Sequence, residues 1–256
     1  MVAVYGEVKS MRRIDLTDVA FCLVARFSTI SRLENAVAVC EFLTENFHTN
    51  IYLWEFDEHS NHFAERIIPD SVHYKFHSDY DPIFHRTRHI NEMIKQINEP
   101  YVSVWDVDVL APVSQIQKTV DVLRSGCDFA YPYEYYFLDT STELRNLYLE
   151  EKDISILEKY KEFMHEMYSP NPVGGAFFAK RESYVKSGIE NERFYGWGFE
   201  DGERLARWNL MGMSVARIPG ILYHLTHSRD NNSTICNQDE YLVKNREYLS
   251  VLRQTR

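Results

Sequence analysis

The sequence predicts an α/β protein built on a mostly parallel central sheet with helices on both of its faces. Three observations lead to this fold class. Short apolar runs rich in β-branched and aromatic residues alternate with helical segments along the first half of the chain. The 256 residues are 45% hydrophobic, an ordinary fraction for a globular protein. No repeat, low-complexity stretch or linker divides the chain, so we expect one domain over residues 1–256.

The alternation can be followed element by element. Strands are expected at 18–27, 50–58, 72–77, 101–105 and 128–137, and helices at 31–47, 86–98 and 114–126. Ser31 and Glu34 have the spacing of a capping box, which makes Ser31 the predicted N-cap of its helix. The second half should contain a charged helical insertion at 140–168, a strand at 174–180, a helix at 200–212, one or two strands at 214–225 and a helix at 237–254.

Composition and charge exclude several function classes. Acidic residues outnumber basic ones by 38 to 28, which argues against a nucleic-acid partner held by bulk electrostatics. No apolar run approaches transmembrane length, and the first residues lack the apolar core of a signal peptide. The four cysteines are scattered without a CxxC pair, as expected for reduced thiols: Cys22, Cys40, Cys127 and Cys236. We therefore expect a cytoplasmic protein without a transmembrane segment.

Two aspartates follow the apolar strand expected at 101–105. On a strand, Asp106 and Asp108 would point to the same face, at the sheet edge where open α/β proteins bind ligands. Two carboxylates this close repel each other unless a cation joins them or one of them takes a proton. The pair therefore indicates half of a divalent-metal site. A polar turn is the alternative, because aspartate is a favoured turn residue.

Two further polar clusters lie late in the sequence. Trp197 stands between two glycines, and Glu200 and Asp201 follow it at a predicted helix start. A carboxylate near an indole can act as a general base, although interaction with the helix dipole is the alternative role. His224 and His227 are suitable ligands for Mn²⁺, Zn²⁺ or Fe²⁺, and a structural role is the alternative for them. These clusters point to sugar and metal chemistry.

The order of the motifs resembles the β-1,4-galactosyltransferase family, inverting glycosyltransferases of the GT-A fold. In chain order the motifs are VARFSTISRL after the first strand, FHRTRHIN (84–91), DVD (106–108), the segment 174–217 with GWGFED, and HSRD (227–230). Together they cover most of residues 18–230. DxD alone is a weak signal, whereas its combination with GWGFED and HSRD is specific. The resemblance implies a UDP-sugar donor and a saccharide acceptor.

The resemblance also implies roles for individual residues. Asp108, His224 and His227 would hold Mn²⁺, or alternatively Mg²⁺, which neutralises the diphosphate leaving group. Asp201 would be the catalytic base, and Glu200 would position sugar hydroxyls. Donor and nucleotide binding would involve Arg26, Phe84, Arg86, Arg88, Asp106, Val107, Gly175 and Trp197, and acceptor binding would involve Trp197, Glu200 and Asp230.

The sequence departs from the family at several positions, which leaves parts of the function open. Ser28 stands where a second arginine is expected, AYPYEYY (130–136) lacks a lysine, and Pro172 occupies a position that helps the family choose its donor sugar. Galactose, N-acetylgalactosamine and glucose all remain as donors, and the oligomeric state is also open. Without the anchor of the animal members, the chain looks like a bacterial enzyme of surface polysaccharide synthesis, in the cytoplasm or at the cytoplasmic face of the membrane.

Two functions of other classes remain as alternatives. A phosphatase of the haloacid dehalogenase type also places an Asp-x-Asp motif after an apolar strand, although on the first strand of its fold. A non-catalytic sugar-binding module would keep the metal and aromatic residues but would not need a carboxylate beside the acceptor hydroxyl.

Overall fold

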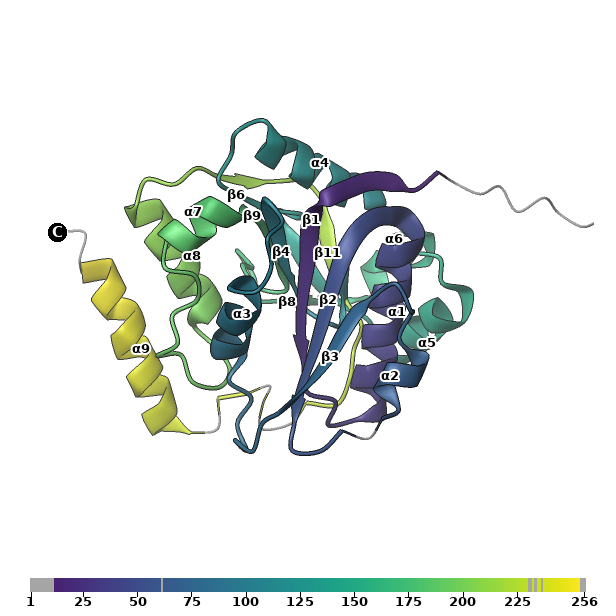
Figure 1. Ribbon diagram of the computed structural model, residues 1–256, viewed down its shortest axis with the longest axis horizontal. Helices are drawn as coiled ribbons and strands as arrows, with labels where there is room; N and C mark the ends of the chain where they lie inside the picture. The colour runs from purple at the N-terminus through teal and green to yellow at the C-terminus, as the bar shows by residue number, and fades with distance from the viewer. Residues whose placement is uncertain (1–11, 61, 230–231, 233, 236, 254–256) are drawn as a thin grey trace, which may run out of the picture.

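The computed structural model describes residues 12–60, 62–229, 232, 234–235 and 237–253. Its centre is a sheet of seven strands (Figure 1). In spatial order these are β10 (Val215–Arg217), β6 (Phe129–Tyr131), β9 (Ala176–Lys180), β4 (Tyr101–Trp105), β1 (Ile14–Ala25), β2 (Phe47–Asp57) and β3 (His73–Ser78). β9 runs antiparallel to β4 and β6, while the other neighbouring pairs are parallel. The predicted mostly parallel α/β sheet is therefore confirmed.

Helices cover both faces of this sheet. In Figure 1, α3 (Arg86–Ile94), α7 (Arg181–Lys186), α8 (Glu200–Leu210) and α9 (Gln238–Arg253) lie on one side, while α1 (Ile30–Asn46), α5 (Thr142–Glu151) and α6 (Ser155–Lys159) lie on the other. Further helices among the described residues are α2 (Ala64–Ile67), α4 (Val113–Arg124) and the 3-10 turn η1 (Lys161–Phe163). All seven residues of β1 from Val19 to Ala25 are buried, as expected of a strand covered on both faces.

A second, smaller sheet carries part of the site. Its strands, in spatial order, are β5 (Val109–Leu110), β11 (Ile221–His224), β7 (Tyr136–Asp139) and β8 (His165–Met167). The run 128–137, predicted as one strand, is thus divided between the two sheets. Pro132 lies at the break and has no N–H group for a strand ladder. The run 214–225 is divided in the same way, with Pro219 and Gly220 between its two strands.

Two predicted boundaries change. The N-cap of α1 is Thr29 and not Ser31, because Thr29 has extended backbone angles and its side chain accepts a hydrogen bond from the Arg32 N–H at 3.3 Å. Ser31 already lies inside the helix. The insertion 140–168 contains α5, α6 and η1, as its charged sequence suggested, and it also contributes β8 to the edge of the smaller sheet. Its status within a single domain over 1–256 stays a prediction.

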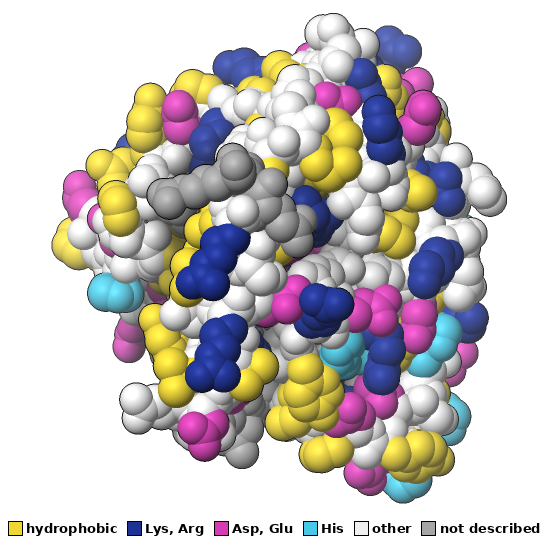
Figure 2. Space-filling view, turned by 90° about the vertical axis from the view of Figure 1, so that its left-hand side faces the viewer, with side chains coloured by type: hydrophobic (Ala, Val, Ile, Leu, Met, Phe, Trp, Pro, Cys, Tyr) yellow, Lys and Arg dark blue, Asp and Glu magenta, His cyan; other side chains and the backbone are white. Residues whose placement is uncertain are grey.

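Membrane-spanning length and cysteine pairing can be judged over the described residues. None of the helices there combines the length and the apolar composition that a membrane span requires. Cys22, Cys40 and Cys127 are free thiols, and burial raises the pKa of Cys40 to about 12. Cys236 lies outside the described residues. On the face seen in Figure 2, basic and acidic side chains are interspersed, a pattern unlike the basic stripe typical of nucleic-acid binding.

Candidate active site

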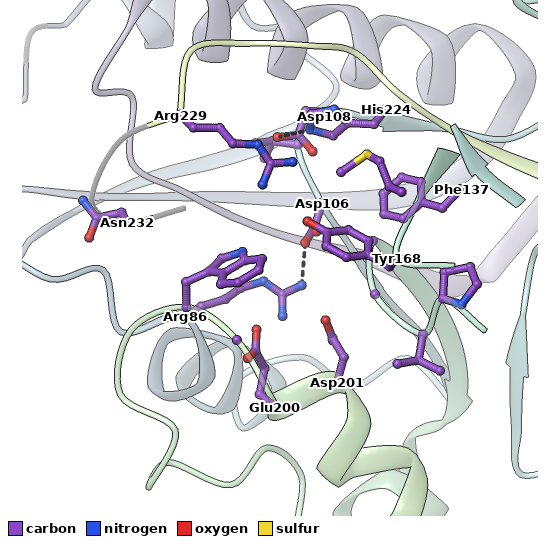
Figure 3. Close-up of a pocket in the computed structure, with 18 of the residues that line it drawn as sticks. Arg86, Asp106, Asp108, Phe137, Tyr168, Glu200, Asp201, His224, Arg229 and Asn232 are labelled. Atoms are coloured by element: carbon purple, nitrogen blue, oxygen red, sulfur yellow. Dashed lines mark hydrogen bonds and ion pairs between the residues drawn. The ribbon is translucent and has the colours of Figure 1, made fainter. Parts of the chain in front are cut away.

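A cavity of about 320 Å³ opens beyond the carboxyl end of β4. It is lined by the loop after β4, the first turn of α8, the segment before β9 and the ends of β7 and β11. Figure 3 shows Asp108 and His224 on one side of this cavity and Glu200 and Asp201 on the opposite side. Ligand sites at the carboxyl ends of strands are typical of open α/β sheets.

Asp108, His224 and His227 converge on one wall of the cavity. His227 Nε2 lies 3.1 Å from Asp108 Oδ2, and His224 Nε2 lies 3.7 Å from the same oxygen. One ligand atom from each residue lies within 4.8 Å of the other two. The smaller sheet creates this proximity, because His224 ends β11 and pairs in register with Val109 of β5 and Asp139 of β7.

The chemistry of this trio fits a divalent transition metal. His224 Nδ1 lies 2.7 Å from Asp139 Oδ1, and His227 Nδ1 lies 2.8 Å from the Ser228 carbonyl oxygen. Such partners orient imidazoles so that the other nitrogen faces a metal. Burial lowers the pKa of His224, but Asp108 and Asp139 outweigh it and raise that pKa to about 9. One carboxylate oxygen and two imidazole nitrogens form a donor set suited to Mn²⁺.

Asp106 lies apart from this trio. β4 ends at Trp105, and the Val109 N–H bonds back to the Asp106 carbonyl at 3.4 Å, so the chain turns between the two aspartates. Asp106 Oδ1 pairs with Arg86 Nη2 at 2.5 Å, the contact drawn between the two walls in Figure 3. The prediction that Asp106 and Asp108 share one strand face is wrong, because the strand ends before the pair begins.

The loop with Trp197 turns sharply into α8. Gly196 and Gly198 have φ of 75° and 101°, a backbone region that favours glycine. Lys244 of α9 is 3% exposed and donates a hydrogen bond to the Trp197 carbonyl oxygen, which holds the loop from behind. The Tyr168 ring lies near the indole, with ring centroids 6.3 Å apart. The half-buried indole is thereby held at the cavity wall, where a sugar ring can contact it.

Glu200 and Asp201 are the first two residues of α8. Glu200 is buried, and this burial, reinforced by the charge of Asp201, raises the pKa of Glu200 to about 7. Asp201 Oδ1 accepts a hydrogen bond from Arg204 at 2.6 Å. Asp201 Oδ2 lies beside Gly174, where a Cβ atom would come within 2.7 Å of it. The absence of a side chain at Gly174 therefore leaves the space that this carboxylate occupies.

Comparison with known proteins finds a family match over part of the chain. A family model described as "N-terminal domain of galactosyltransferase" matches residues 157–230, less than a third of the chain, and this segment contains Glu200, Asp201, His224 and His227. No curated protein matches the chain.

Solved structures share the fold at low sequence identity. The catalytic domain of Drosophila β1,4-galactosyltransferase 7 with xylobiose matches at TM-score 0.52 and 15% identity, covering 90% of this chain and 79% of that one. A mutant of that enzyme with manganese, UDP-Gal and xylobiose gives 0.52 and 15%, with coverages of 88% and 79%. Glucosyl-3-phosphoglycerate synthase from Mycobacterium tuberculosis with Mn²⁺, UDP and phosphoglyceric acid gives 0.50 and 14%, with coverages of 93% and 78%.

The chain has the GT-A fold, and its segment 157–230 is similar to the galactosyltransferase family. The family match covers the segment with the late motifs, and the structural likeness covers nearly the whole chain. The predicted GT-A fold is therefore confirmed, and the family match over residues 157–230 supports the resemblance found in the sequence.

The residues predicted to bind the nucleotide fall into two groups. One group lines the cavity: Phe84, Arg86, Asp106, Val107, Gly175 and Trp197. Arg26 and Arg88 instead pair with Asp79, at 3.1 and 3.6 Å. Arg26 also donates to the backbone carbonyls of Phe56 and Asp81, although it borders a smaller cavity next to Phe84. Arg26 thus ties β1 to β2 and to the loop after β3.

Gly175 lines the cavity for a different reason than expected. The resemblance placed Gly175 among the residues that bind the donor. Its φ is +81°, and a Cβ atom there would lie 2.7 Å from Leu222 and 2.9 Å from Phe137. The neighbouring side chains fill this space, so backbone conformation and packing require the glycine. Asp230, the remaining acceptor candidate, lies outside the described residues.

The cavity lining also includes polar residues to which we assigned no role from the sequence. Among them are Arg32, Tyr168, Asn171, Arg229 and Asn232. Asp139, the partner of His224, also escaped prediction, although a signal was present. It closes the apolar run 136–139 in the same way that Asp106 closes the run 101–105. Tyr168 gave no such signal, because the turn of the chain after β8 brings it to the cavity.

Proposed function

We propose that this protein is an inverting, metal-dependent glycosyltransferase that transfers galactose or N-acetylgalactosamine from a UDP-sugar to a saccharide hydroxyl. One observation carries the proposal: a single cavity has a metal-binding trio on one wall and a carboxylate pair on the opposite wall. Manganese and UDP-Gal in the Drosophila structure, and Mn²⁺ and UDP in the mycobacterial one, support the same ion and nucleotide here.

The donor would lie between the two walls. Asp108, His224 and His227 would hold Mn²⁺, which when bound neutralises the charge that develops on the diphosphate. Arg86 faces the same space. Its Nη1 atom is buried without a hydrogen-bond partner among the described residues, so it can donate to a donor oxygen, while its Nη2 atom stays on Asp106.

Asp201 would act on the acceptor. It takes the proton of the acceptor hydroxyl as that oxygen forms a bond to the anomeric carbon, and the bond from that carbon to the diphosphate oxygen breaks on the opposite face. UDP leaves, the sugar configuration inverts, and the proton remains on Asp201. Glu200, with its pKa raised to about 7 by burial, is partly protonated near neutrality and can donate to a sugar hydroxyl. Trp197 would contact the sugar ring.

Thermal unfolding with UDP, with and without Mn²⁺, tests the donor site. A ligand at 100 times its Kd stabilises a protein by about 2.7 kcal/mol, and chelator should remove this stabilisation. UDP release from UDP-galactose, UDP-N-acetylgalactosamine and UDP-glucose should then identify the donor in the presence of saccharide acceptors. Stabilisation by UDP that persists in chelator would contradict the metal-dependent site.

The alternatives are less well supported. In a phosphatase of the haloacid dehalogenase type the aspartates open the fold, whereas here they follow the central strand β4 of a GT-A fold. A non-catalytic sugar binder is distinguished by measuring transfer. The choice of donor sugar, a role in bacterial surface polysaccharide synthesis and a cytoplasmic location stay predictions of the sequence.

A further inference from the structure

We propose that Arg204 is a positioning residue for transfer. It holds Asp201 through Oδ1 so that Oδ2 is the oxygen that takes the acceptor proton, and the buried carboxylate of Glu190 holds Arg204 in place. This inference rests on the proposed function, in which Asp201 is the base.

Arg204 is one of the most buried charged residues of the protein, with 1% of its surface exposed. It lies one turn into α8, and its guanidinium bridges two carboxylates. Nη2 donates to Asp201 Oδ1 at 2.6 Å, and Nη1 donates to Glu190 Oε2 at 2.9 Å. The guanidinium also stacks on the Phe177 ring, at 4.2 Å from its centroid. A charge this deeply buried is held in one geometry, because any other leaves it unpaired.

Glu190 is itself fixed from several sides. It is 3% exposed, and its Oε1 atom accepts a hydrogen bond from the Tyr184 hydroxyl. The Asn91 side chain accepts from the Glu190 backbone N–H at 2.9 Å and donates to the Glu190 carbonyl oxygen at 2.9 Å. α3, which carries Asn91, and α7, which carries Tyr184, thus anchor the residue on which Arg204 rests. The position of Asp201 is set by a chain of contacts that ends in the core.

This chain of contacts makes the two oxygens of Asp201 unequal. Oδ1 is occupied by Arg204, whereas Oδ2 lies beside Gly174 on the cavity wall. The acceptor proton should therefore go to Oδ2. Arg204 pairs with Glu190 as well as with Asp201, so the guanidinium does not interact with Asp201 alone. Orientation of a reacting group within about 1 Å can change a rate about 10²-fold, so such a support should matter for transfer.

Arg207 offers a matched control one turn further along α8. Its guanidinium pairs with Glu203 and donates to the Ser187 and Ile189 carbonyl oxygens, and none of its contacts in the described structure involves Asp201. Both arginines therefore join α8 to the segment after α7, but only Arg204 touches the proposed base. Substitution of either arginine should lower the stability of the protein. Only substitution of Arg204 should also lower the transfer rate.

The experiment compares Arg204→Lys, Glu190→Gln and Arg207→Lys with the wild type by thermal unfolding, by UDP binding with Mn²⁺, and by kcat and KM for transfer. Lysine keeps the charge but cannot bridge both carboxylates. We expect Arg204→Lys to lower kcat about 10- to 100-fold while UDP affinity stays within about twofold. Glu190→Gln should have a smaller effect of the same kind, and Arg207→Lys should leave kcat within about twofold.

Other results would overturn the inference. Transfer by Arg204→Lys at the wild-type kcat would reject Arg204 as a positioning residue and leave the proposed function intact. An equal loss of UDP affinity and kcat would make Arg204 a general support of the cavity. If the wild type transfers no sugar from any of the three UDP-sugars, the proposed function fails and this inference fails with it.

Discussion

The two walls of the cavity are built in different ways. The metal wall takes its side chains from the loop after β4, from the end of β11 and from the segment after it, and each histidine has one outer acceptor. The opposite wall, called the transfer wall, takes Glu200 and Asp201 from the first turn of α8. Arg204, which is paired with Glu190, supports Asp201 from the protein interior. Because the two walls share none of these supports, substitutions should separate donor binding from transfer.

The largest difference between the effect on transfer and the effect on UDP binding is expected for a substitution of Asp201. Asp201→Asn keeps the size of the side chain and can still accept a hydrogen bond from Arg204, but it cannot take a proton. General-base catalysis typically contributes about 10²–10⁴-fold, so kcat should fall by that factor while UDP affinity with Mn²⁺ stays near that of the wild type. Titration of UDP followed by transfer kinetics measures both quantities.

Asp108→Ala is the comparison variant for the opposite wall. It removes the carboxylate of the metal trio, so it should weaken both Mn²⁺-dependent UDP binding and transfer. If Asp201→Asn transferred sugar at the wild-type rate, Glu200 would become the candidate base. If Asp201→Asn lost UDP binding as well, the two walls would not be separable in the way proposed here.

A smaller effect, on metal affinity, is expected when the hydrogen-bond partner of His224 is removed. Asp139→Ala removes the acceptor of His224 Nδ1, which lies 2.7 Å away. Loss of such a partner typically costs about 10- to 100-fold in metal affinity. Titration of Mn²⁺ in the presence of UDP should show this loss, and Asp139→Asn should recover part of it because the amide oxygen can still accept. Unchanged Mn²⁺ affinity in Asp139→Ala would remove His224 from the proposed ligand set.

The same contrast explains what the sequence could predict. Asp108, His224 and His227 could be found because their motifs are local and their residue types have few other uses in that combination. The supports of the transfer wall could not be found. Glu190 gives no local signal, and its contact with Arg204 exists only because α8 packs against the segment after α7. Arg26 and Arg88 were predicted to bind the donor nucleotide, and nothing in the sequence indicates that both of them pair with Asp79.

The segment after β4 shows the same limit of prediction from sequence. The apolar runs that became β1, β2 and β4 were predictable from composition alone. The conformation of the two aspartates that follow β4 was not, because an aspartate can extend a strand or start a turn, and tertiary contacts decide between them. This difference matters for the site, because it decides which residue Asp106 contacts. The turn that follows Trp105 makes Asp106 a partner of Arg86 and not of Asp108.

The smallest expected effect concerns Glu200. The pH dependence of stability tests whether ionisation of this buried carboxylate destabilises the folded protein. Burial raises the pKa of Glu200 from 4.5 to about 7. Between these values the folded protein binds more protons at this site than the unfolded chain does, so stability falls as pH rises through this window. From about pH 5 to about pH 7 the loss should be about 2 kcal/mol, and Glu200→Gln should not show it.

Urea unfolding at both pH values, without metal or UDP, measures this difference. The quantity to compare is the change in unfolding free energy between the two pH values, in the wild type and in Glu200→Gln. Glu162→Gln is the control, because Glu162 is exposed on η1 and its loss should leave the wild-type pH dependence in place. An identical pH dependence in wild type and Glu200→Gln would mean that Glu200 is charged and hydrated in the folded protein. It would then be a poor hydrogen-bond donor to a sugar hydroxyl, and the transfer wall would resemble the metal wall in its access to water.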